Sequence, residues 1–117
     1  MVKNELLSYQ FAERIKSELI IGSKMLGTVE MLAGSELAGA NKALSAFFDA
    51  LAMDTGMALK ATGDPEFAMV EEELDLIKHK LKAADYGEAQ ATIGRAVSHA
   101  TTACARTMSV LMEKGLL

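Results

Sequence analysis

The sequence predicts an all-α fold, specifically an antiparallel four-helix bundle built from two long helical hairpins, as one domain over residues 1–117. The only proline, Pro65, lies near the middle of the chain in the run Gly63-Asp64-Pro65-Glu66. There Gly63 can close one helix, Asp64 can cap the next, and Pro65 suits a first helical turn. On both sides of this run, apolar residues recur at steps of three and four, which is the period of a helix with one buried face.

The first hairpin comprises a helix from about Asn4 to Ala33 and a helix from about Ser35 to Thr62, separated by a stop and a cap in Gly34-Ser35-Glu36. The inward positions predicted for the first helix are Phe11, Ile15, Leu19, Gly22, Leu26, Val29 and Ala33. Those predicted for the second are Leu37, Ala40, Leu44, Phe47, Leu51 and Ala58.

The second hairpin begins at Asp64, and its first helix carries the apolar seam Phe67, Val70, Leu74, Ile77, Leu81 and Ala84. The run Asp85-Tyr86-Gly87-Glu88 has the form of a capping box and opens the last helix, which ends near Gly115. That helix is expected to bury Ile93, Val97, Ala100, Cys104, Met108 and Leu111. Gly22 and Gly94 each cost about 1 kcal/mol relative to alanine inside a helix, which indicates close approach of a neighbouring helix, the alternative being a ligand that uses the space.

Composition excludes several classes of function. The formal charge of −4 lacks the basic excess typical of nucleic-acid binding. The single cysteine, Cys104, allows no internal disulfide and favours a reducing compartment. The first residues lack the apolar core of a secretory signal, and no apolar stretch approaches the roughly 20 residues that span a bilayer. We therefore expect a soluble cytoplasmic protein that binds neither membranes nor nucleic acid, and no motif implies a cofactor or a set of catalytic residues.

His79 is a candidate phosphoacceptor. Counting from the Leu74, Ile77 and Leu81 seam places it on the outer face of its helix. The run His79-Lys80-Leu81-Lys82 resembles the His-x-x-Lys-Gly signature of histidine phosphotransfer domains, although Ala83 stands where that family has its glycine. The resemblance implies a signalling module that carries a phosphoryl group on His79. The alternative is a solvated helix face, because acids at the start of a helix and lysines at its end suit the helix dipole.

The acidic run Glu71-Glu72-Glu73-Leu74-Asp75, followed by a turn and a second helix, resembles the metal-dependent all-α nucleotide pyrophosphatases of the MazG-like family. In that family the second helix carries further acids, whereas this chain has Ala91-Thr92-Ile93-Gly94-Arg95 there. A magnesium site needs converging carboxylates, so the resemblance implies a degenerate relative and no metal site.

Two other groups of polar residues are candidate sites. Asp54 falls inside the apolar face of its helix, where a carboxylate is costly unless it is paired or bound to a cation, and we expect the paired structural role. Arg95, His99 and Arg106 share one polar stripe and could hold an anion, the alternative being a solvated face. His99 and Cys104 diverge by about 140° around the helix, which argues against a shared metal site.

Apolar residues outside the predicted core suggest a second set of contacts. Leu6, Ile20 and Met31 lie opposite the main stripe of the first helix, and Met53 and Met57 lie at one edge of the second. Methionine-rich surfaces adapt well to partners. The sequence therefore favours a small non-enzymatic protein that forms a homodimer or larger homo-oligomer and acts through contacts with itself and with an unidentified protein partner.

Overall fold

The chain is helical throughout most of its length. The computed structural model describes residues 2–116 and contains α1 (Val2–Val29), α2 (Gly34–Thr62), α3 (Pro65–Lys82) and α4 (Tyr86–Glu113). No strand occurs among the described residues. The predicted all-α class is therefore confirmed. Within the same residues, none of the helices combines the length and the apolar character needed to cross a membrane.

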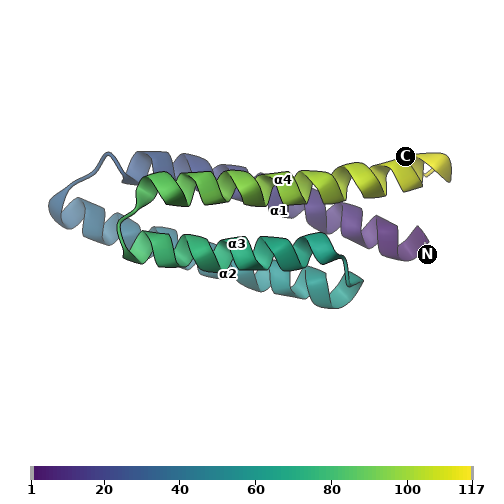
Figure 1. The fold of residues 1–117 in the computed structure, drawn as a ribbon, viewed down its shortest axis with the longest axis horizontal. Helices are drawn as coiled ribbons and strands as arrows, with labels where there is room; N and C mark the ends of the chain where they lie inside the picture. The colour runs from purple at the N-terminus through teal and green to yellow at the C-terminus, as the bar shows by residue number, and fades with distance from the viewer. Residues whose placement is uncertain (1, 117) are drawn as a thin grey trace.

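Each helix packs against two others. Helix α1 contacts α2 and α4, and α3 contacts the same two helices. Figure 1 shows the resulting elongated shape, which measures 54 × 21 × 18 Å. Helix α3 has 18 residues, whereas the other three have 28 or 29. The α1–α2 connection therefore extends past the α3–α4 connection at one end, and both termini extend past the α2–α3 connection at the other (Figure 1).

The central turn forms as the sequence predicts. Gly63 adopts a left-handed conformation with φ of 69° and its N–H donates to the Leu59 carbonyl, which ends α2. The Asp64 side chain accepts a hydrogen bond from the Glu66 N–H, and Pro65 is the first residue of α3. Asp85 caps α4 in the same way by accepting from the Glu88 N–H. Glycine, aspartate and proline thus set three of the helix boundaries.

Two helix ends differ from the prediction. Helix α1 ends at Val29, and Ala33, expected in the core, is exposed in extended backbone that precedes α2. Because α2 already begins at Gly34, the predicted cap at Ser35 is wrong, and Ala33 provides no side-chain cap. Ala84, also expected in the core, leaves α3 with a positive φ of 57° and is exposed. The three- and four-residue spacing of apolar residues continues past the last residue of α1 and past the last residue of α3. A prediction from this spacing alone therefore makes both helices too long.

The core contains most of the predicted apolar positions, with one exchange in α2. Phe48 is fully buried and Phe47 only partly, so the buried stripe is Leu44, Phe48, Leu51, Thr55 and Ala58. Gly22 is the reason both rings fit, since a Cβ there would lie 2.9 Å from Cζ of Phe48 and 3.0 Å from Cε2 of Phe47. The close approach predicted at Gly22 is confirmed. The one predicted at Gly94 is wrong, because Gly94 is exposed and open space surrounds its Cα.

Candidate functional site

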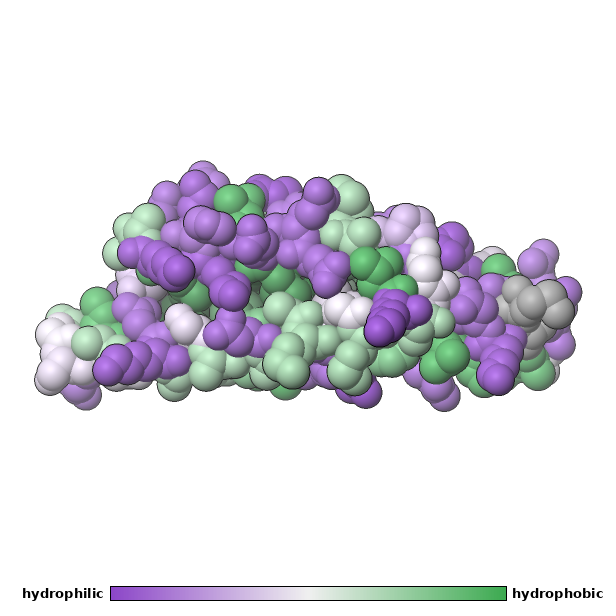
Figure 2. Space-filling model, turned by 90° about the horizontal axis from the view of Figure 1, so that it is seen from below, coloured by the Kyte–Doolittle hydropathy of each residue, from purple (hydrophilic) through white to green (hydrophobic). Residues whose placement is uncertain are grey.

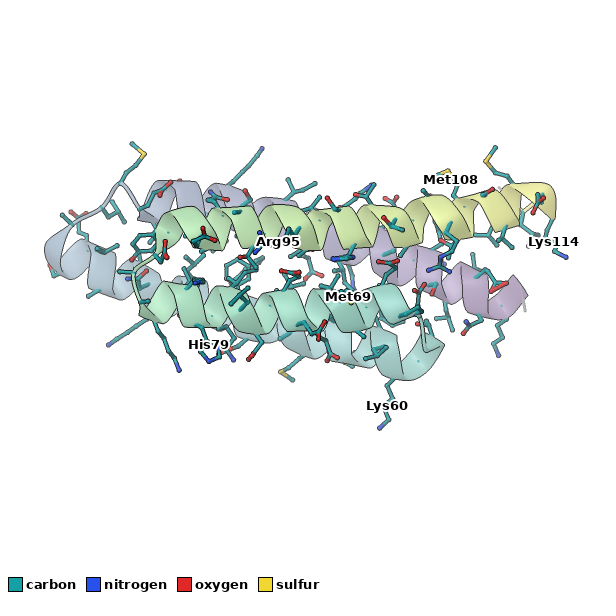
Figure 3. All side chains as sticks on the ribbon, in the orientation of Figure 1. Lys60, Met69, His79, Arg95, Met108 and Lys114 are labelled. Atoms are coloured by element: carbon teal, nitrogen blue, oxygen red, sulfur yellow. The ribbon has the colours of Figure 1, made fainter. Side chains whose placement is uncertain are left out.

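A row of polar side-chain contacts joins α4 to the start and middle of α3. Nε of Arg95 lies 3.5 Å from Oε2 of Glu73, and Arg95 also donates to the Thr92 hydroxyl at 2.9 Å. Nδ1 of His99 lies 3.0 Å from Oε1 of Glu66. Figure 3 shows Arg95 between α4 and α3.

The third pair completes the row, since Arg106 donates a hydrogen bond to the Asp64 carboxylate just before α3. The three side chains that the sequence suggested as an anion site, Arg95, His99 and Arg106, therefore each face a carboxylate. A free anion would have to displace these carboxylates. The row instead fixes the rotation of α4 against α3.

Asp64 is the most enclosed acid of the row and links three segments. Its Oδ1 accepts from the Glu66 N–H, and its Oδ2 accepts from the Ser8 hydroxyl of α1 at 3.0 Å and from Arg106 of α4. Among the described residues it is the one charged side chain in the buried class. Burial alone would raise the pKa of Asp64, but its hydrogen bonds, the one from Arg106 foremost, hold that pKa below its ordinary value. Asp64 is therefore ionised at neutral pH and holds these helices together.

Asp54, the acid that the sequence singled out, lies at the contact between α1 and α2. Its Oδ1 lies 3.4 Å from Nη2 of Arg14, and its side chain is 28% exposed. Glu18 lies beside it, with a buried Oε1 that has no hydrogen-bond partner in the described part of the chain. Burial raises the pKa of Glu18, the neighbouring Asp54 carboxylate raises it further, and Arg14 opposes both. The cluster is thus two carboxylates that share one arginine.

His79 lies on the outer side of α3, as its helical phase predicts (Figure 3). Its side chain is 70% exposed, and Nδ1 lies 2.8 Å from the Asp75 carbonyl. No acid, base or cation from another helix contacts it among the described residues. The histidine is accessible to a partner protein, and the Asp75 carboxylate of its own helix lies beside it, with Oδ2 3.8 Å from Nδ1.

The acidic run of α3 contains a paired residue and exposed ones, and Cys104 is buried. Glu73 pairs with Arg95, while Glu72 and Asp75 are exposed. Over residues 2–116, no group of three or more His, Cys, Asp or Glu side chains is arranged to hold a metal ion. Burial raises the pKa of the Cys104 thiol to about 11, so the reactive thiolate is scarce at neutral pH.

The five apolar residues suggested as an interface are all exposed, but they do not form one surface. Met53 and Met57 lie on α2 with 72% and 55% of their surface exposed, and Met31 is 83% exposed at the α1–α2 connection. Leu6 and Ile20 are 40% and 42% exposed on α1. Ile20 follows Glu18 by two residues, or about 200° around the helix, so it lies away from the α2 side where Glu18 meets Asp54. Met53 and Met57 therefore belong to a different face from Leu6 and Ile20.

The pairing between α3 and α4 is not visible in the sequence. Asp64 is recognisable there as a cap and Arg106 as part of a polar stripe, but nothing in the sequence connects the two. The pairing depends on the rotation of each helix, which the residues on either helix alone do not determine. Comparisons with family models, with curated proteins and with solved structures find no match. What the chain does is therefore inferred from its own side chains.

Proposed function

We propose that this chain is a single-domain antiparallel four-helix bundle that self-associates and acts through protein–protein contacts, without chemistry of its own. The observation that carries the proposal is the exposure of large apolar side chains well inside the helices, above all Met53 and Met57 on α2. Exposed apolar residues are normal when scattered singly, but several along one helix face usually serve a contact. A reducing cytoplasmic setting belongs to this proposal, and the buried free thiol of Cys104 is compatible with it.

The arrangement of the polar residues supports a structural use of the charges. Arg95, His99 and Arg106 each contact an acid, and Asp54 contacts Arg14. A shallow surface groove of about 490 Å³ is lined by Asn41, Lys42, Ser45, Ala46, Asp49, Leu81 and Lys82. In this groove Asp49 is paired with Lys78, and over residues 2–116 the Ser45 hydroxyl makes no hydrogen bond to Asp49 or to a lysine, so we propose no hydrolytic or transfer reaction there.

Light scattering on the purified chain at tens of micromolar tests the proposal. We expect a mass above the 12.5 kDa of one chain. A variant with glutamate at both Met53 and Met57 should shift toward one chain while keeping its helical circular dichroism. A wild-type protein that stays at one chain mass and retains no protein partner in a pull-down would contradict the proposal.

A histidine phosphotransfer role for His79 is the second candidate. The observation in its favour is the accessibility of the imidazole on the outer side of α3 beside Lys78, Lys80 and Lys82. Lysines beside a phosphohistidine offset the charge of the phosphoryl group. In this role the chain would accept a phosphoryl group from a partner and pass it on, so it would still act through protein contact.

A further inference from the structure

The outward face of α2 is apolar along most of its length. Its exposed residues recur at alternating steps of four and three, which is the spacing of a coiled-coil contact: Gly39, Ala43, Ala46, Ala50, Met53 and Met57. They lie on the opposite side of α2 from the buried stripe that contains Phe48. Figure 2 shows pale green patches, interrupted by purple side chains, along α2 below the mainly purple surface of α3. The helix therefore has two apolar faces, of which the fold covers one.

Two opposite charges border this face on the same flank. Lys42 and Asp49 are seven residues apart, a separation of about 10 Å along the helix that returns to the same side. Asp49 contacts Lys78 at 2.8 Å and is still 56% exposed. Lys42 is exposed and has no ion-pair partner within the described residues. At these two positions the flank presents a cation, Lys42, that is unpaired within residues 2–116, and an accessible anion, Asp49.

A second copy of the chain satisfies both charges at once. If two α2 helices cross in opposite directions about a twofold axis midway between Lys42 and Asp49, each Lys42 faces Asp49 of the other copy. Because the twofold axis repeats the contact between Lys42 and Asp49, two ion pairs form between the copies. A parallel twofold arrangement would instead place this flank of the two copies on opposite sides of the contact, so that neither ion pair could form. Charge complementarity therefore selects both the partner and its direction.

The sizes of the side chains fit the same register. Gly39, Ala43, Ala46 and Ala50 lie closest to the axis, where small residues let two helix backbones approach closely. In this register Met57 lies opposite Gly34 of the other copy, near the strongly exposed Met31. Large apolar side chains thus meet at the two ends of the contact, where the α1–α2 connection extends beyond α3 (Figure 1).

We propose that the apolar face of α2 is the self-association surface and that its occupant is α2 of a second copy, antiparallel, with the twofold axis between Ser45 and Ala46. The inference rests on the proposed self-association and adds the surface, the partner and the register. A twofold contact uses the same patch on both chains, so it closes as a dimer. Leu6 and Ile20 lie outside this contact.

Cysteine cross-linking tests the surface, with Ala46→Cys near the proposed axis and Ala91→Cys as the matched control. Both alanines are exposed inside long helices, and Ala91 lies on α4. Under mild oxidation we expect a disulfide-linked dimer from Ala46→Cys and little from Ala91→Cys. A wild type that dimerises while Ala46→Cys fails to cross-link, or cross-links no better than Ala91→Cys, would overturn the α2 contact and leave self-association intact. A monomeric wild type would contradict both.

Charge exchange tests the register. Lys42→Glu places two acids opposite each other, and Asp49→Lys places two lysines opposite each other, so each variant alone should dimerise about tenfold more weakly. Mixing the two variants restores both attractions across a heterodimer, and we expect the mixture to associate at near wild-type affinity. The mixture also controls for folding, since an unfolded variant could not restore association. A mixture no tighter than either variant alone would contradict the proposed register.

Discussion

The guanidinium of Arg106 donates a hydrogen bond to the carboxylate of Asp64, and this contact connects α4 to the turn between α2 and α3 across 42 positions of sequence. The same carboxylate caps α3 and accepts from Ser8 of α1. The Asp64 side chain thus caps the start of α3 and also fixes the position of that helix among the other helices. Its removal should affect the whole fold and not just the first turn of α3.

We expect Asp64→Ala to lower the free energy of unfolding by roughly 2–3 kcal/mol, since it removes a helix cap and a hydrogen-bonded charge. The matched control is Asp85→Ala, because Asp85 is an exposed cap whose carboxylate accepts from the Glu88 N–H and from no side chain of another helix in residues 2–116. That variant should lose only about 1 kcal/mol. Urea denaturation at neutral pH measures both, and equal losses would show that the Arg106 and Ser8 contacts add nothing.

The lowered pKa of Asp64 gives this contribution a definite pH dependence. A carboxyl whose pKa is lower in the folded chain stabilises it fully above the ordinary value, here 3.8, and the contribution is lost as the pH falls through the folded pKa. Acid should therefore destabilise the wild type more steeply below pH 3.8 than it does Asp64→Ala.

Gly22 and Gly94 form a matched pair of helical glycines with opposite surroundings. Gly22→Ala should destabilise the fold by roughly 1 kcal/mol or more, since overpacking against Phe47 and Phe48 outweighs the better helix propensity of alanine. Gly94→Ala meets open space and should stabilise it by up to about 1 kcal/mol. Thermal melts followed by circular dichroism distinguish the two, and a Gly22→Ala variant as stable as Gly94→Ala would contradict the packing described here.

Glu18 should weaken the fold when it is ionised. Its pKa is raised in the folded chain, so its ionisation opposes folding at pH values above that raised pKa, and the penalty is relieved as the pH falls toward 4.5. We expect Glu18→Gln to raise the free energy of unfolding at neutral pH by about 0.5–1 kcal/mol, because the amide removes a charge beside Asp54.

The difference in the free energy of unfolding between the wild type and Glu18→Gln should shrink as the pH falls through the raised pKa of Glu18. Urea melts at neutral and mildly acidic pH measure it. A Glu18→Gln variant that is less stable than the wild type at neutral pH would show that the Arg14 contact outweighs the repulsion from Asp54.

His79 and His99 differ in their accessibility to a phosphodonor. His79 is exposed, whereas His99 lies against Glu66 with 28% of its side chain exposed. After incubation with a small phosphodonor or a phosphorylated receiver domain, any acid-labile phosphate should be absent from His79→Gln and retained in His99→Gln. Intact mass measured before and after acid treatment detects it, and a phosphate that persists in His79→Gln would exclude the phosphotransfer role.

The sequence predicted the helices better than their mutual rotation. Gly63, Asp64, Pro65 and Asp85 determine boundaries through local hydrogen bonds and backbone angles, which neighbouring residues reveal. Phe47 and Phe48 are adjacent and only about 100° apart on the helix, so periodicity alone did not decide which ring is buried.

The candidate site depended even more on tertiary packing. The stripe of Arg95, His99 and Arg106 was visible in the sequence, but its acidic partners lie on another helix. Asp64 was recognisable as a cap, and its burial arises only when α1 and α4 pack around it. Contacts between helices require a rotation and a register for each pair, and no single helix carries that information.

Sedimentation equilibrium of the wild-type chain over a range of loading concentrations tests self-association most directly. We expect the apparent mass to rise with concentration from 12.5 kDa and to level off at twice that value, because a twofold contact closes with two chains. A mass that stays at 12.5 kDa up to the highest concentration would contradict self-association.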